Sequence, residues 1–154
     1  MTLIQGISLI MADQWNLIEH EVEGGESTFT PRYGFIFEER KMFNVVADNT
    51  LMPCVFLEEY RDGRYNVKFG IKKHTTVQLS FMKLCPFDGD AIDREAQRNT
   101  IEVEAVIPFI ESFNNLRPFQ EELQEFKFFT PPPRFDTNEV SIMLQFEVVF
   151  QLAK

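Results

Sequence analysis

The sequence contains few cysteines and histidines, and it has no long apolar run. Cys54 and Cys85 are the only cysteines, and each lies in an apolar, strand-like context, which predicts two buried free thiols and no disulfide. A metal site around His20 would need a second ligand nearby, and the only other histidine is the distant His74. No apolar stretch reaches membrane-spanning length, and residues 1–11 lack the basic leading region of an export signal. We expect no metal, no membrane segment and no export.

Positive charge is also scarce. Lys and Arg number 15 against 24 Asp and Glu, for a net charge of −9. A field of that sign repels nucleic-acid phosphates and anionic lipid, so we expect neither sequence-specific nucleic-acid binding nor membrane association. The main basic cluster, residues 64–73, alternates with apolar residues and is interpreted as the solvated face of a strand.

Sequence motifs for catalysis are missing. The seven glycines are scattered, and the chain has no Gly-x-Ser-x-Gly elbow, phosphate-binding loop or dinucleotide fingerprint. Acidic pairs such as Glu58-Glu59 are common in any acidic protein, and adjacent residues on a strand point apart. Pairing Cys54 with His74 as nucleophile and base has no support in their spacing. We therefore expect no enzyme and no cofactor.

What the chain has in excess is phenylalanine. The 17 Phe residues in a 154-residue chain can fill a large core, but aromatic residues are also enriched at protein interfaces. The length fits one domain, residues 1–154, and no linker or internal repeat divides it.

Helical spacing of apolar residues occurs in two regions. The first is a helix that ends before Gly24-Gly25. The second is a helix capped by Asp88, finished by Asn114-Asn115, and kinked or broken at Pro108. The apolar stripes expected to be buried are Leu3, Ile4, Ile7, Ile10, Met11, Trp15 and Ile18 in the first helix, and Ile92, Ala96, Val103, Val106, Ile107, Ile110 and Phe113 in the second.

Strand patterns fill most of the remaining sequence. Residues 52–60 and 64–84 are predicted as strands joined by a hairpin turn at Asp62-Gly63, and residues 123–129 and 140–152 as two more. The order of elements lacks the regular alternation of a parallel doubly wound sheet. The predicted fold class is therefore α+β, an antiparallel or mixed β-sheet with two main helices packed on one face.

Two aromatic segments are candidate interfaces. One runs through Phe126, Phe128, Phe129, Pro132 and Phe135, next to the triple proline, and the other contains Tyr33 and Phe35. Large rings beside an extended turn are costly in water and useful against a neighbour, whereas the alternative is a core strand followed by a tight connection. The sequence leaves both readings open.

The arrangement of these elements resembles bacteriophage tail terminator (tail completion) proteins. The likeness consists of the first helix over residues 3–18, the strand Met52-Pro53-Cys54-Val55-Phe56-Leu57-Glu58, the long strand 75–84, the helix 90–113, and the closing strands that end at Leu152. It covers nearly the whole chain and is architectural.

The resemblance implies a protein without enzymatic activity that forms a ring, commonly a hexamer, capping the tail tube. Its expected partners are further copies of itself, the tube protein and head or neck proteins, with a location in the cytoplasm during assembly and then in the virion. Within such a ring, Glu38, Glu39, Glu58 and Glu59 are candidates to line a lumen that repels passing DNA. The alternatives are a tube or connector protein, a cytosolic adaptor, and a small ligand-binding domain.

Overall fold

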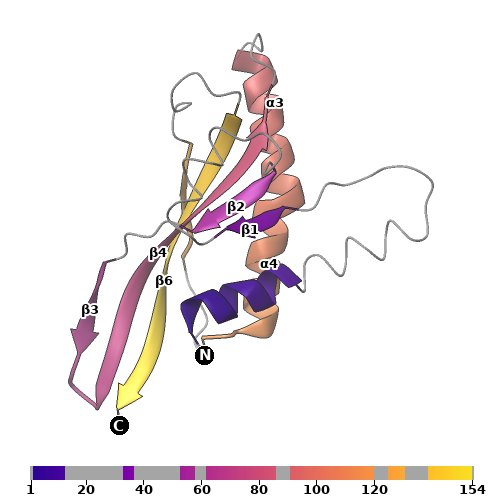
Figure 1. Ribbon diagram of the computed structural model, residues 1–154. Coiled ribbons are helices and arrows are strands. Elements are labelled where there is room, and N and C mark those ends of the chain that lie inside the picture. Colours follow the sequence, from indigo (N-terminus) through magenta and orange to yellow (C-terminus); the bar gives the residue numbers. More distant parts are fainter. Residues whose placement is uncertain are drawn as a thin grey trace.

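The computed structural model describes residues 2–12, 33–36, 53–57, 62–85, 91–119, 125–130 and 139–153. Its strands are β1 (Gly34–Ile36), β2 (Cys54–Leu57), β3 (Gly63–Asn66), β4 (Ile71–Leu84), β5 (Lys127–Phe129) and β6 (Glu139–Ala153). Residues 3–12 form an N-terminal helix. A second, longer helix consists of α3 (Ala91–Ile101), the π-helical η2 (Glu102–Val106) and α4 (Ile107–Leu116). The protein has the predicted α+β fold (Figure 1).

The six strands form one mixed sheet in the order β1-β2-β4-β6-β5, with β3 also paired to β4. Of the strand pairs in the described ranges, only β1–β2 is parallel, and the other four are antiparallel. The centre is the pairing of β4 with β6, which runs from Leu84 opposite Glu139 to Ile71 opposite Ala153. β6 matches the predicted last strand within one residue at each end, because its β-branched and aromatic residues contain no breaker.

The predicted turn at Asp62-Gly63 is wrong. β2 and β3 both pair antiparallel with β4, Leu57 opposite Leu79 and Gly63 opposite Thr75, so the chain runs in the same direction through both. It reverses instead between β3 and β4, where Gly70 has a φ of 88°. The side chain of Asn66 starts this reversal by accepting a hydrogen bond from the Lys68 amide at 3.0 Å, as in an Asx turn.

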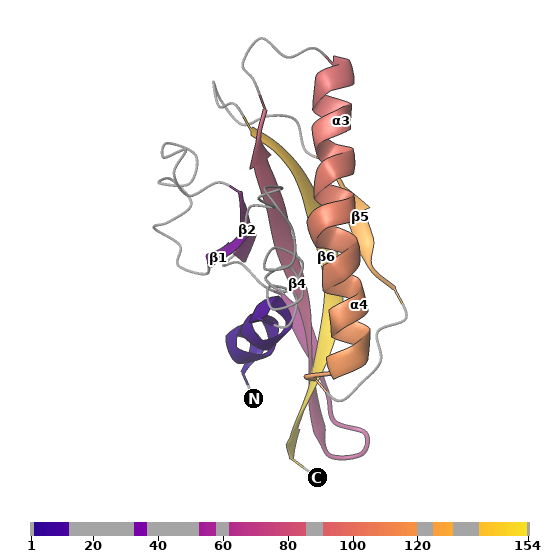
Figure 2. The same ribbon diagram turned by 90° about the vertical axis from the view of Figure 1, so that its right-hand side faces the viewer.

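Both helices cover the same face of the sheet, here called the inner face. Figures 1 and 2 show the N-terminal helix beside α4, next to the strands. The strands contribute buried Val55, Leu57, Val77, Leu79, Phe81, Val140, Ile142, Leu144, Phe146 and Val148. The N-terminal helix contributes buried Leu3, Ile7, Ile10 and Met11, as predicted, and Ile4 is partly buried against the core. Trp15 and Ile18 lie outside the described residues.

A cluster of phenylalanine rings fills the space between helices and sheet. The ring of Phe113 lies 5.6–6.2 Å, centre to centre, from those of Phe109, Phe119, Phe126 and Phe146. The cluster extends through Phe109 to Phe81 and through Phe119 to Phe150. Edge-to-face and tilted contacts at these spacings are favourable beyond the area they bury. Most of the phenylalanines whose side chains the structure describes therefore serve the core of a single chain.

The buried stripe of the long helix differs from the prediction. Val106 and Phe113 are buried as expected and Ile110 packs against the core, but the side chains of Ile92 and Val103 are 74% and 68% exposed. Ala96 and Ile107, which were also expected to be buried, are exposed as well. The residues that face the sheet are Ile101, Ala105, Val106, Phe109, Ser112 and Phe113. This helix has apolar residues on two sides, so helical periodicity alone was compatible with burial of either side.

Pro108 does not break the helix. The turn before it is π-helical, and the amide of Ile107 donates to the carbonyl of Glu102, five residues earlier. Proline lacks an amide hydrogen and clashes with the carbonyl four residues before it, and a wider turn accommodates that clash. The helix continues to Leu116 and ends with Arg117 in the left-handed conformation, whereas the predicted cap Asp88 lies outside the described residues.

Candidate functional site

The predicted interface residues fall into two groups in the structure. Tyr33 and Phe126 pack inside the chain: Tyr33 is fully buried, with its hydroxyl donating to Glu104 Oε2 at 3.4 Å, and Phe126 contacts Phe113 and Phe146. Phe128 and Phe129 are exposed on β5. The other candidates lie outside the described residues: Pro132, Phe135, Glu38, Glu39, Glu58, Glu59 and the side chain of Phe35.

The two aromatic segments nevertheless contain the two edge strands of the described sheet. Among the described strands, β1, with Phe35 opposite Val55, is the last on one side of the sheet, and β5 is the last on the other. Each has three residues. An edge strand leaves backbone N–H and C=O groups able to pair with another chain, and short edges limit such pairing.

Among the residues that the structure describes, the most exposed apolar surface lies elsewhere, at the end of the sheet that extends past the helices. Figures 1 and 2 both show β3, the start of β4 and the end of β6 projecting beyond the N-terminal helix and α4. We call residues 63–75 together with Leu152 the hairpin end. Its exposed apolar side chains are Tyr65, Val67, Phe69, Ile71 and Leu152, of which Phe69 is 82% exposed.

The hairpin end is also the basic part of an acidic protein. Residues 63–75 include Arg64, Lys68, Lys72 and Lys73 and no Asp or Glu. The Lys68 amine lies 5.6 Å from the centre of the Phe69 ring, a cation–π contact. The predicted alternating strand is present here, but it folds back on itself and its apolar side chains are exposed.

A polar network crosses the outer face of the sheet at the base of the hairpin end. Glu147 accepts from Arg64 Nη1 at 3.2 Å, and its other oxygen lies 3.0 Å from His74 Nδ1. The His74 hydrogen bond and the Arg64 charge hold the pKa of the Glu147 carboxyl below its ordinary value. These contacts link β3, β4 and β6 to one another, so their role is to stabilise the sheet.

The side chains considered for catalysis are not brought together. Cys54 pairs with Met82, eight residues along β4 from His74, a separation of about 26 Å at strand spacing. Both cysteines are buried thiols, as predicted, and burial is the main reason that the pKa of Cys54 rises to about 12. Such a thiol is a poor nucleophile.

Neither a metal cluster nor a membrane-spanning helix occurs in the parts of the chain that the structure describes. Among those residues, no three Asp, Glu, His or Cys side chains gather as ligands would. Their helices are likewise too short or too polar to cross a bilayer.

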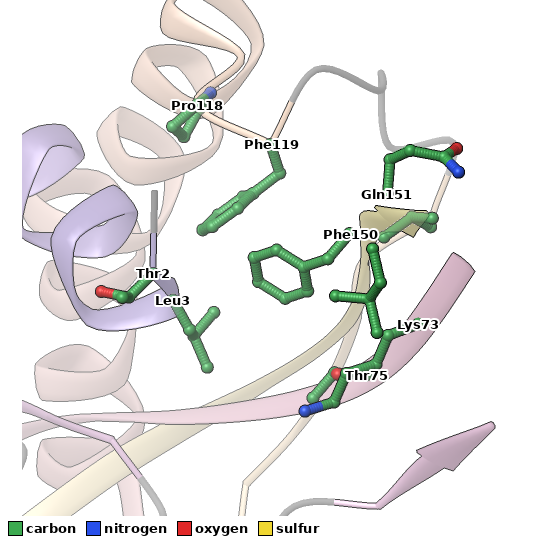
Figure 3. Close-up of a pocket in the computed structure, with 10 residues that line it drawn as sticks. Thr2, Leu3, Lys73, Thr75, Pro118, Phe119, Phe150 and Gln151 are labelled. Atoms are coloured by element: carbon green, nitrogen blue, oxygen red, sulfur yellow. The ribbon is translucent and has the colours of Figure 1, made fainter. Parts of the chain in front are cut away.

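A pocket of about 480 Å³ lies on the inner face where the sheet leaves the helices. The rings of Phe119 and Phe150 point toward each other there, with their centres 5.5 Å apart, and Leu3 lies nearby (Figure 3). Lys73 and Gln151 add polar groups. Thr2 and Gln5, which cap the N-terminal helix through reciprocal hydrogen bonds of 2.9 and 3.2 Å, hold Leu3 at this position. The pocket can receive an apolar side chain or a small ligand.

A second exposed apolar surface runs along the outward side of the long helix. Ile92, Val103 and Ile107 are exposed. Ile92 and Val103 lie 11 residues apart, about three α-helical turns, and Ile107 follows Val103 by about one turn of the π-helical segment, so the three lie on one side of the helix. Glu95, Glu102 and Glu111 are exposed next to them. We call these six residues the helix stripe.

Sequence reasoning missed both the hairpin end and the helix stripe as exposed surfaces. The signals were present, because Asn-Val-Lys-Phe-Gly over residues 66–70 carries turn chemistry and the helix has more apolar residues than one stripe can hold.

Comparison with known proteins finds no matching family model and no curated protein that matches the sequence. The proposal below therefore rests on the architecture and surfaces of the chain itself.

Proposed function

We propose that this protein is a structural assembly protein of a phage or prophage tail that caps the tail tube as an oligomeric ring and joins it to head or neck proteins. The observation that carries the proposal is the hairpin end, whose exposed apolar residues, such as Phe69 and Tyr65, project past the helices. An exposed apolar surface of this kind marks an interaction site.

The architecture supports the same proposal. The N-terminal helix, the long strands β4 and β6, and the long helix correspond to the elements on which the resemblance to tail terminators rests. The short edge strands β1 and β5 limit uncontrolled pairing of the sheet with further chains, which is consistent with an assembly of fixed size.

The proposed ring would form in the cytoplasm during assembly and become part of the virion. The net charge of −9 suits a channel for DNA, since like charge keeps phosphates from adhering to its wall. Glu38, Glu39, Glu58 and Glu59 remain the candidates for that wall. No role for a cofactor is proposed.

The experiment is the absolute mass in solution, measured by light scattering after size exclusion at protein concentrations from micromolar to millimolar. We expect one discrete closed species of about six subunits whose size does not grow with concentration. Open-ended polymers would point to a tube protein instead. A strict monomer throughout would contradict the proposal and favour an adaptor or a ligand-binding domain using the pocket beside Phe150.

A further inference from the structure

The hairpin end and the helix stripe have opposite charge and lie at different places on the molecule. The hairpin end combines exposed apolar residues with Lys68, Lys72 and Lys73. The helix stripe combines Ile92, Val103 and Ile107 with three glutamates. Each surface therefore offers an apolar centre with charges of one sign around it, the composition expected of two sides of one interface.

The basic residues of the long helix do not neutralise its stripe. Arg94 is half-buried and turns toward the sheet, with Nη1 3.5 Å from the carbonyl oxygen of Glu139. Arg98 is likewise half-buried, whereas Glu95, Glu102 and Glu111 are exposed. The outward side of the helix is accordingly acidic.

The two surfaces cannot meet within one chain. Figures 1 and 2 show the hairpin end continuing the sheet beyond the end of α4, whereas the helix stripe lies on the side of the long helix that faces away from the sheet. A contact between them requires two copies. Two hairpin ends repel each other, and so do two helix stripes, so a two-fold symmetric dimer through either surface is disfavoured.

We infer that the hairpin end of one copy docks on the helix stripe of the next, a head-to-tail contact between copies of this chain. Phe69 and Val67 pack against Val103 and Ile107, while the lysines face the glutamates. Because such a contact leaves one hairpin end and one helix stripe open, it repeats until a ring closes or a filament grows. The inference rests on the proposed function only for the expectation that the assembly closes.

The test exchanges charges between the two surfaces. One variant carries Lys68→Glu and Lys72→Glu, and the other carries Glu95→Lys and Glu102→Lys. In each variant alone, the hairpin end and the helix stripe now carry charge of the same sign and repel each other. We therefore expect its self-association to weaken at least about tenfold. In a one-to-one mixture every contact between unlike variants regains opposite charges, so the mixture is expected to assemble as the unaltered protein does.

Controls separate this contact from other effects. The exposed residues Glu125 and Lys127, at the β5 edge, allow matched variants Glu125→Lys and Lys127→Glu, which should leave assembly unchanged. Because every altered side chain is at least partly exposed, melting temperatures should stay within a few degrees of the unaltered protein, and circular dichroism should match. Raising the salt concentration should weaken the assembly of the unaltered protein, since exposed charges are screened.

The outcomes distinguish the contact from the tube-capping role. Closed rings that persist in both charge-reversed variants would overturn the contact and leave tube capping standing. Open filaments that depend on these charges would support the contact and refute capping. A monomeric protein that binds phosphatidylserine vesicles through Lys68 and Lys72 would overturn the contact, as would assembly abolished by Lys127→Glu alone.

Discussion

Phe113 shows how single residues of this chain act through their neighbours. Its ring is nearly inaccessible to solvent and lies within 6.2 Å, centre to centre, of four other phenylalanine rings from α4, β6 and the segments before β5 and after α4. The surrounding residues come from several elements, so they have little freedom to collapse into a void at this position. The cost of truncating Phe113 should therefore lie near the upper end of the usual range.

We expect Phe113→Ala to lower the free energy of unfolding by about 3–5 kcal/mol, a large fraction of the total stability of a domain. Urea unfolding followed by circular dichroism measures this change. The matched control is Phe128→Ala, because that side chain is 71% exposed and its loss should alter stability by less than about 0.5 kcal/mol. Equal effects of the two substitutions would contradict the placement of the aromatic cluster.

Cys54 links burial to pH dependence. Burial, and to a smaller extent the Glu139 carboxylate, raises the pKa of its thiol from 9.0 to about 12. Burial and the neighbouring Glu104 likewise raise the pKa of Tyr33 above its ordinary value of 10.0. In both cases the unfolded chain loses its proton at a lower pH than the folded chain. Their contribution to stability is therefore complete below about pH 8.5 and declines as the pH rises toward 12.

We expect the unfolding free energy to fall as the pH rises above about 9, and Cys54→Ala to make that fall less steep. Urea titrations at several pH values between 7 and 11 measure both slopes. A thiol reagent should also react slowly with the folded protein at pH 8 and quickly after unfolding. Identical slopes for the two proteins would show that Cys54 is not the buried titrating group.

At the scale of elements, the pairing of β3 with β4 depends on a glycine. A Cβ atom on Gly63 would lie 1.8 Å from the carbonyl oxygen of His74. That oxygen belongs to the backbone of β4 and cannot move without disturbing the pairing of Arg64 with His74. The hairpin end is thus positioned by a residue without a side chain.

We expect Gly63→Ala to loosen the hairpin end while leaving the helices and the rest of the sheet folded. The matched substitution Thr76→Ala removes a half-buried side chain from the partner strand β4 and should cause little change. Amide hydrogen exchange measures the difference, with faster exchange expected over residues 63–75 in the glycine variant alone. Unchanged exchange in both variants would refute the close approach.

The long helix shows why element boundaries were predicted better than element faces. Its apolar residues occur at helical spacing on more than one side, and both sides satisfy the pattern. The π-helical turn before Pro108 then shifts the residues that follow relative to those that precede it. Only packing against β4 and β6 selected the side with Ile101 and Phe109.

At the scale of the whole molecule, the helices cover only part of the inner face of the sheet, and the proposed function depends on the part that they leave uncovered. The helices cover the inner face as far as Val148, and the pocket beside Phe150 marks where their cover ends. Beyond it the sheet carries exposed apolar and basic side chains. The net charge of −9 is therefore unevenly distributed, as the proposed docking between unlike parts of two copies requires.

The amino-acid sequence by itself determined the fold class, the N-terminal helix over its described part, the last strand and the buried state of both cysteines. These features follow from local periodicity and apolar content, which act over a few neighbouring residues. Tertiary structure decided which face of the long helix is buried and where the chain reverses before β4. It also decided which phenylalanines leave the core, because burial depends on which distant segments compete for the same inner face of the sheet.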